Sequence, residues 1–156
     1  MKKLKINDHI LEFCVTGMDD AADIFEIENE CFSSGWSQKL VIDEISNKNS
    51  ISFVCKSDGK VVGYIFIRYL FEEGEIFKVC VKPDFRKMKI ASELMEMSLD
   101  FAFEKGVEKC FLEVRKSNIN AIFLYEKFGF SVYAQRNNYY ADNGEDALLM
   151  QKDMGL

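Results

Sequence analysis

The sequence predicts a mixed α/β domain in which about seven strands form one mostly antiparallel sheet flanked by about four helices. Apolar residues alternate or run together in short strand-like segments, and between these segments they recur with the 3.6-residue period of helices. One strand–helix–strand order, over 75–115, requires a right-handed crossover and therefore one parallel strand pair. The other strands follow one another through short turns. We therefore expect a mixed sheet rather than a doubly wound one, within a single domain spanning 1–156.

The first elements are a strand over 10–16 and a helix over 21–32. Thr16 and Asp19 have the spacing of a capping box, which would start that helix. Ser37 is a candidate cap for a second, shorter helix, which ends in a polar stretch rich in asparagine.

The middle of the chain predicts three consecutive strands that form a meander. Asp58-Gly59 is a strong signal for a two-residue hairpin, and a second turn follows at 72–74. The expected strands cover 51–57, 61–71 and 75–82.

The remaining elements alternate between helix and strand before the chain ends in two strands. Gly106 and Gly129 are typical helix ends, and Asn118 is a candidate helix start. The expected helices cover 89–106 and 118–128, and the expected strands cover 107–115, 130–140 and 147–154. The strands at 75–82 and 107–115 would form the parallel pair.

Charge and rare residues limit the classes of function. The chain has 26 acidic and 20 basic side chains, a net charge of −6, which disfavours direct nucleic-acid binding and suits either a basic partner or simple solubility. A single histidine, His9, excludes a site with several histidine ligands, and we expect no metal.

Cysteine usage and hydropathy indicate the compartment. The five cysteines are dispersed, odd in number and without a C-x-x-C pair, which is typical of reduced thiols in the cytoplasm. We find neither a signal peptide nor an apolar run of membrane-spanning length, so we expect no membrane partner. The cysteines are Cys14, Cys31, Cys55, Cys80 and Cys110.

A first candidate site lies at 81–95, where a strand ends, a basic turn follows and a helix begins. Lys82, Arg86, Lys87 and Lys89 gather there in an otherwise acidic chain. The free N–H groups of a helix start, together with positive charge, favour an anion such as phosphate. The same stretch also fits a solvated basic turn.

A second candidate site combines Glu113 with the helix that follows it. Glu113 lies near the end of the second strand of the parallel pair, where ligands gather in such sheets. Tyr125 and Asn118 are seven residues apart and therefore share one helix face. A carboxylate and a phenol at one crevice could relay protons. Alternatively, Glu113 is a salt-bridged strand residue and Tyr125 a core aromatic.

Together the two sites resemble the GNAT acetyltransferase superfamily over nearly the whole chain. The acyl-CoA pyrophosphate loop of that family resembles Val81, Pro83, Phe85, Arg86, Lys89 and Ala91. The second family motif matches Asn118, Ala121, Leu124, Tyr125, Gly129 and Phe130. Three further segments resemble the RimI subfamily, which acetylates the N-terminal alanine of a small-subunit ribosomal protein: C-F-S-S-G-W-S at 31–37, L-E-V-R-x-S-N at 112–118 and R-N-N-Y-Y-x-x-x-G-E-D-A at 136–147.

The resemblance implies acetyl-CoA as co-substrate and assigns residues to it. The backbone of Val79, Cys80 and Val81 would pair with the pantetheine arm as an added strand. Glu113 would act as general base through water, and Tyr125 as the general acid that protonates the CoA thiolate. An N–H near Cys80 would stabilise the oxyanion. The remaining residues implied for the cofactor are Arg86, Lys87, Met88, Lys89, Ile90, Ala91, Ser92 and Asn118.

The implied acceptor is a protein N-terminus, such as that of a basic ribosomal protein. Freeing an α-amine near pH 7 costs roughly 3–4 kcal/mol less than freeing a lysine amine, which suits a lone carboxylate base. A GNAT acting on a small amine or a lysine, or a CoA-binding module without turnover, remains an alternative. The candidates for a peptide-binding rim, which also fit ordinary surface and sheet packing, are Trp36, Glu75, Arg136, Tyr139 and Tyr140.

Three positions depart from the family pattern. Lys89 stands where the loop usually has glycine, which allows positive φ and close approach to phosphate. A lysine at positive φ would be strained by roughly 1–2 kcal/mol, whereas at negative φ it would fit as a helix residue. Gly35 replaces a frequent proline and Lys78 a small polar residue, both near the expected peptide site.

Overall fold

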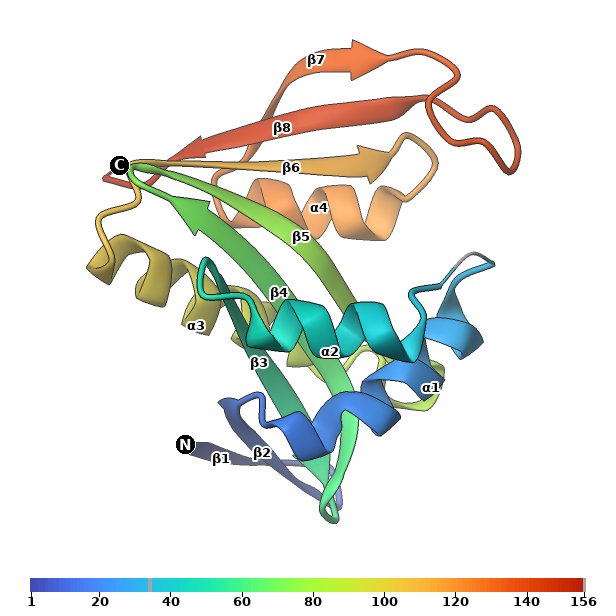
Figure 1. Ribbon diagram of the computed structural model, residues 1–156, viewed down its shortest axis with the longest axis vertical. Helices are drawn as coiled ribbons and strands as arrows, with labels where there is room; N and C mark the ends of the chain where they lie inside the picture. The colour runs from blue at the N-terminus through green and yellow to red at the C-terminus, as the bar shows by residue number, and fades with distance from the viewer. Residues whose placement is uncertain (34, 156) are drawn as a thin grey trace.

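The computed structural model describes residues 1–33 and 35–155, so Ser34 in the 31–37 segment lies outside the described residues (Figure 1). Eight strands form one sheet in the order β1-β2-β3-β4-β5-β6-β8-β7. The strands are β1 (Lys2–Ile6), β2 (His9–Val15), β3 (Ser50–Ser57), β4 (Lys60–Leu70), β5 (Glu73–Val81), β6 (Lys109–Arg115), β7 (Ser131–Arg136) and β8 (Ala147–Asp153). The helices are η1 (Met18–Asp20), α1 (Ala21–Cys31), α2 (Gln38–Ser46), η2 (Pro83–Phe85), α3 (Ile90–Glu104) and α4 (Ile119–Lys127).

The predicted mixed sheet is confirmed, with one strand more than expected. Every neighbouring pair is antiparallel except β5 and β6. The unpredicted strand is β1, which pairs with β2 at the edge of the sheet. Its sequence, K-K-L-K-I, has too few apolar residues for a strand signal, but lysines are common on edge strands because they discourage pairing with another chain.

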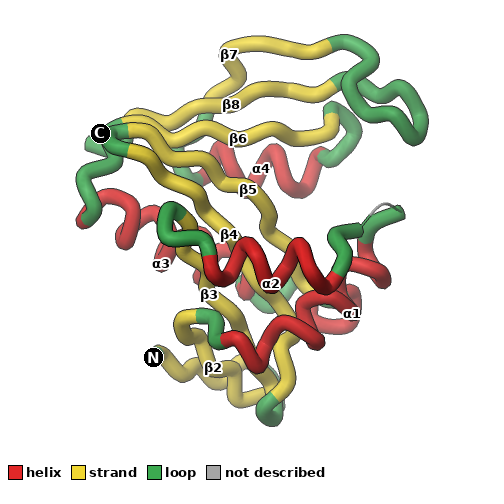
Figure 2. Tube along the Cα trace, in the orientation of Figure 1, coloured by secondary structure: helices red, strands yellow, loops and turns green. Residues whose placement is uncertain are grey.

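Helices cover both faces of the sheet (Figure 2). They pack onto it through two hydrophobic clusters. On one face, α3 and α4 contribute Leu94, Met95 and Tyr125 to the larger core cluster. On the other face, α1 and α2 contribute Ile27 and Val41 to the smaller one. No helix within 1–33 and 35–155 is long and apolar enough to cross a bilayer.

The local turn signals are mostly confirmed. Asp58 and Gly59 both have positive φ, 51° and 79°, as the two-residue hairpin requires. The expected cap before the first helix is wrong by one residue: the Gly17 N–H donates to Asp20 Oδ2 at 2.8 Å, so Gly17 and Asp20 take the places predicted for Thr16 and Asp19.

The expected strand over 130–140 is too long. β7 ends at Arg136, and the chain turns at Asn138, whose φ is 52°. Asparagine tolerates this left-handed conformation, which ends the strand although two tyrosines follow.

The parallel pair opens into a fork. β5 and β6 pair over only three positions, which end at Glu75 and Phe111. Beyond them the two strands separate, and β6 continues toward β8 while β5 continues along β4 (Figure 1). β5 also carries a bulge, because Phe66 pairs with Lys78 and Ile67 with Ile76, which leaves Phe77 as an extra residue. Bulges re-aim side chains and are frequent beside active sites.

Candidate active site

A cleft of about 810 Å³ lies between the separated parts of β5 and β6. Strand β5 contributes Glu75 through Val79 to its walls, and β6 contributes Glu113 through Arg115. Helix α4 and the segment between β7 and β8 complete the cleft with Asn118, Tyr125, Tyr139 and Tyr140. The cleft therefore brings both predicted catalytic residues and five further predicted site residues together, namely Glu75, Val79, Asn118, Tyr139 and Tyr140.

Glu113 and Tyr125 reach this cleft from opposite sides of β6. Leu112 and Val114 are buried beneath β6, so alternation points Glu113 to the opposite face. The Glu113 carboxylate is about one-third exposed, and its ion-pair partner is Arg136, with 3.7 Å between Oε1 and Nη1. A proton could therefore leave the cleft through Glu113.

Tyr125 is buried against the larger core cluster, and its ring contacts Phe130 edge to face at 6.1 Å between centroids. Burial, with a smaller effect of Tyr140, raises the pKa of Tyr125 to about 12. The phenol therefore stays protonated at neutral pH and can donate a proton or a hydrogen bond into the cleft.

Asn118 begins α4, as its position before an apolar helix predicts. Its Oδ1 accepts from the Ala121 N–H at 3.3 Å, which satisfies one free donor of the helix start. Since this bond uses only the oxygen, the side-chain amide N–H groups can donate to a ligand in the cleft.

The predicted pantetheine-binding segment of β5 has one free edge. Val79, Cys80 and Val81 pair with β4 through Ile65, Tyr64 and Gly63, whereas the β5–β6 ladder ends at Glu75. Among the described residues, no strand covers the other edge of this segment. An extended ligand could therefore add to it as a further strand.

The loop between η2 and α3 has the backbone shape of an anion site. Lys87 and Lys89 both have positive φ, 64° and 62°. Lys89 therefore has the strained left-handed backbone conformation and not the negative φ of a helix residue. Lys89 is the N-cap of α3 and makes no side-chain cap bond. The N–H groups of Ile90, Ala91 and Ser92 therefore stand at an uncapped helix start, as phosphate binding requires.

The other predicted loop residues support this turn. Arg86 Nε donates to the carbonyl oxygen of Val81 at 3.1 Å, which ties the loop back to the end of β5. Met88 packs against the larger core cluster, and Ile90 is buried within it. These two side chains anchor the loop, and only their backbone groups are free for a ligand.

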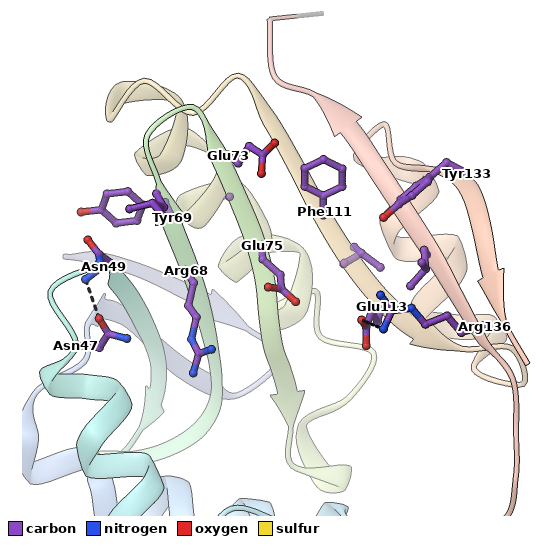
Figure 3. Close-up of a pocket in the computed structure, with 14 residues that line it drawn as sticks. Asn47, Asn49, Arg68, Tyr69, Glu73, Glu75, Phe111, Glu113, Tyr133 and Arg136 are labelled. Carbon is purple, nitrogen blue, oxygen red and sulfur yellow. Dashed lines mark hydrogen bonds and ion pairs between the residues drawn. The ribbon is translucent and has the colours of Figure 1, made fainter. Parts of the chain in front are cut away.

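A second cavity, of about 500 Å³, adjoins the cleft and shares Glu75 and Glu113 with it (Figure 3). Arg68, Arg136 and Tyr133 also line it. The predicted rim residues Glu75 and Arg136 therefore lie together, while Tyr139 and Tyr140 line the cleft.

Trp36, the fifth predicted rim residue, does not line either cavity and lies behind the cleft wall. Its ring contacts those of Phe66 and Phe77, at 5.5 and 5.4 Å between centroids. The fully buried Glu28 accepts from the Trp36 N–H at 2.9 Å and from Lys78 Nζ at 2.6 Å. Trp36 thus supports the wall, and its contact with a substrate stays a prediction.

Sequence reasoning missed the residues that hold the segment between β7 and β8 over the cleft. Arg115 pairs with Asp142 at 2.9 Å and with Glu145 at 3.3 Å, and its guanidinium lies 3.9 Å from the Tyr140 ring centroid. Glu145 also accepts from the Ser117 N–H at 2.7 Å. The available signal was the alternation at 112–115, which places Arg115 on the face of Glu113.

Comparisons with known proteins agree with this geometry. The model of the Acetyltransferase (GNAT) family matches residues 21–130. An Escherichia coli ribosomal protein bS18-alanine N-acetyltransferase is 31% identical over 133 residues, covering 84% of this chain and 89% of its own length. A Bacillus subtilis protein that carries the same name provisionally is 34% identical over 134 residues, covering 85% of this chain and 89% of its own.

The fold agrees with that of a solved relative. The crystal structure of the ribosomal-protein-alanine N-acetyltransferase from Escherichia coli matches with a TM-score of 0.85 at 28% identity, and the match covers 92% of this chain and 94% of that chain. The residues matched by the family model include both β5 and β6, which form the fork. The chain therefore belongs to the GNAT family of acetyltransferases.

Proposed function

We propose that this acetyltransferase moves the acetyl group of acetyl-CoA to the α-amine of a protein N-terminus, with the N-terminal alanine of a small-subunit ribosomal protein as acceptor. The observation that carries the proposal is the fork: Glu113 and Tyr125 line one cleft from opposite sides of β6. The relatives named for bS18-alanine acetylation support this choice of acceptor. The five free cysteines favour a reducing compartment such as the cytoplasm.

Acetyl-CoA would bind along the free edge of β5 and at the start of α3. The backbone of Val79, Cys80 and Val81 offers strand-like hydrogen bonds to the pantetheine arm. The N–H groups across Lys87 to Ser92, beside the Arg86 guanidinium, would hold the pyrophosphate. Asn118 would donate its side-chain amide to the arm of the cofactor.

The reaction would be a direct attack of the amine on the thioester. The nitrogen forms a bond to the carbonyl carbon as Glu113 takes its proton through water, and an N–H near Cys80 stabilises the oxyanion. The C–S bond then breaks, and Tyr125 donates a proton to the thiolate. Tyr125 is protonated before the step, because an ordinary phenol has a pKa near 10 and burial raises the pKa of Tyr125 further.

The acceptor would approach over the cavity that adjoins the cleft. Glu75 and Glu113 lie where the incoming amine would arrive, with Arg136, Tyr139 and Tyr140 beside them. The nearby Glu113 carboxylate and, to a smaller extent, burial raise the pKa of the Tyr139 phenol, so Tyr139 stays a hydrogen-bond donor at the rim. A peptide backbone crossing this rim would meet both donors and aromatic faces.

A peptide panel tests the proposal. We expect acetyl-CoA to release free thiol rapidly with a peptide that begins with alanine and has the sequence of a ribosomal protein N-terminus. The matched control is the same peptide with a blocked N-terminus and an internal lysine, and polyamines form a third arm. Faster turnover of the lysine peptide or a polyamine would contradict the proposed acceptor. Acetyl-CoA binding without turnover of any amine would indicate a non-catalytic module.

A further inference from the structure

Glu75 occupies the point at which the fork opens. It is the last residue of β5 that pairs with β6, and it lines both cavities. Within 1–33 and 35–155, its half-buried carboxylate makes no side-chain hydrogen bond and no ion pair. Such a carboxylate normally has a cationic or hydrogen-bonding partner, so its open position beside the cleft points to a ligand with positive charge.

The nearest basic candidate on β4 is already engaged. Arg68 lies opposite Glu75 where β4 pairs with β5, but its Nε and Nη2 atoms both donate to the Glu44 carboxylate, with 3.0 Å between Nε and Oε2. The same guanidinium stacks 3.6 Å from the ring centroid of Phe77. Arg68 is therefore held toward α2 and leaves the charge of Glu75 available to the cavity.

A second carboxylate faces the same opening. Glu75 is opposite Phe111, and Glu113 lies two residues further along β6 on the same face, so the two are diagonal neighbours (Figure 3). Burial, followed by the charge of Glu113, raises the pKa of Glu75, while Arg68 acts in the opposite direction. The titratable or charged groups that line this cavity are Arg68, Tyr69, Glu73, Glu75, Glu113, Tyr133 and Arg136.

We propose that Glu75 and Glu113 act as a carboxylate pair on the acceptor, in which Glu75 receives the α-ammonium and removes its first proton. This inference rests on the proposed acetyl transfer and adds a second catalytic residue to it. Acetylation converts an ammonium with three N–H bonds into an amide with one, so two protons must leave the nitrogen. Two separate carboxylates at the fork provide one acceptor for each proton.

The proton balance assigns one role to each group. Glu75 takes one proton from the bound ammonium and leaves the neutral amine. The amine nitrogen then bonds to the thioester carbon, and Glu113 takes the second proton. When the C–S bond breaks, the thiolate receives a proton from Tyr125, which is restored by one of the two carboxylic acids. The second carboxylic acid loses its proton to solvent, so the turnover releases one proton.

The pH dependence of two variants separates these roles. We expect Glu75→Gln to lower kcat/KM for the alanine-start peptide about tenfold at pH 7, where only about a tenth of an α-amine is neutral without the help of a base. That loss should shrink to less than about threefold at pH 9.5, where an α-amine with a pKa near 7.7–8.0 arrives already neutral. Glu113→Gln should keep its full loss at both pH values, because the second proton must leave at any pH.

Controls separate proton transfer from a structural effect. Glu108→Gln changes an exposed carboxylate just before β6 that lines neither cavity, and it should leave the rate within about threefold of wild type. Glu75→Asp should restore part of the lost rate at pH 7, and calorimetric affinity for acetyl-CoA should be unchanged in all variants. A Glu75→Gln loss that is absent at pH 7, or equally large at pH 9.5, would overturn the pair. Failure of the wild type to turn over any amine would overturn the proposed function itself.

Discussion

Single residues in the cleft acquire their properties from burial rather than from their identity. Tyr125 and Tyr133 are both tyrosines near β6, but Tyr125 is 6% exposed and Tyr133 48%. Burial raises the pKa of Tyr125 to about 12. A tyrosine in a family motif can be identified from the sequence, whereas its degree of burial depends on how helix α4 packs against β6.

The proposed acid role of Tyr125 predicts a specific kinetic defect. Tyr125→Phe removes the proton donor for the thiolate, so we expect kcat to fall about 10²–10⁴-fold while the affinity for acetyl-CoA is retained. Steady-state thiol release and calorimetry measure the two quantities. Tyr133→Phe, which changes a tyrosine in the adjoining cavity only, is the matched control and should leave kcat unchanged. Equal rates for both variants would contradict the assignment of Tyr125.

At the scale of elements, the strands and helices with strong patterns could be predicted, and the irregularities could not. The hairpin at Asp58-Gly59 follows from two residue types that accept positive φ. The bulge at Phe77 leaves no comparable signal, since it arises from how β4 and β5 pair. The position of the fork likewise depends on strand pairing, because β5 continues along β4 while β6 continues along β8. The sequence therefore predicts which strands are parallel but not where they part.

The start of α3 illustrates a conflict between local preference and site geometry. Lys89 has φ 62° as the N-cap, a conformation that costs a non-glycine residue about 1–2 kcal/mol. The sequence allows either a positive or a negative φ at Lys89, and the structure is needed to decide between the two. Because the loop keeps this shape with a lysine, the surrounding contacts must impose it, including the bond from Arg86 to the Val81 carbonyl.

Relief of this strain predicts a stabilising substitution. Lys89→Gly removes the left-handed penalty but makes the unfolded chain more flexible, so we expect a net gain of about 0.5–1 kcal/mol in the free energy of unfolding. Thermal denaturation should show a rise in Tm of about 2 °C. Lys105→Gly is the matched control, since Lys105 has φ −83° at the other end of α3 and should lose stability. A loss of stability in Lys89→Gly would show that the lysine side chain itself stabilises the loop.

At the scale of the whole molecule, the fork divides the site between two approaches. Along β5, the cavity with Glu75 and Arg136 adjoins the cleft near the beginning of the strand, whereas the free edge continues toward the end of the strand and the start of α3. The two substrates would thus meet at Glu113 without sharing a path. Three acidic residues line the acceptor cavity, namely Glu73, Glu75 and Glu113, and one of its two arginines is paired with Glu44. Both this cavity and the whole chain, with its net charge of −6, therefore favour a basic acceptor.

This charge distribution predicts that salt selectively slows the reaction with basic peptides. Long-range attraction is screened as the Debye length falls from about 30 Å at 0.01 M to about 10 Å at 0.1 M ionic strength. With saturating acetyl-CoA, kcat/KM for an alanine-start peptide followed by several lysines and arginines should fall about tenfold over that range. A peptide with the same first residue and a neutral sequence after it should change far less. If both peptides respond equally to salt, the acidic surface does not attract the acceptor, and its role is then limited to solubility.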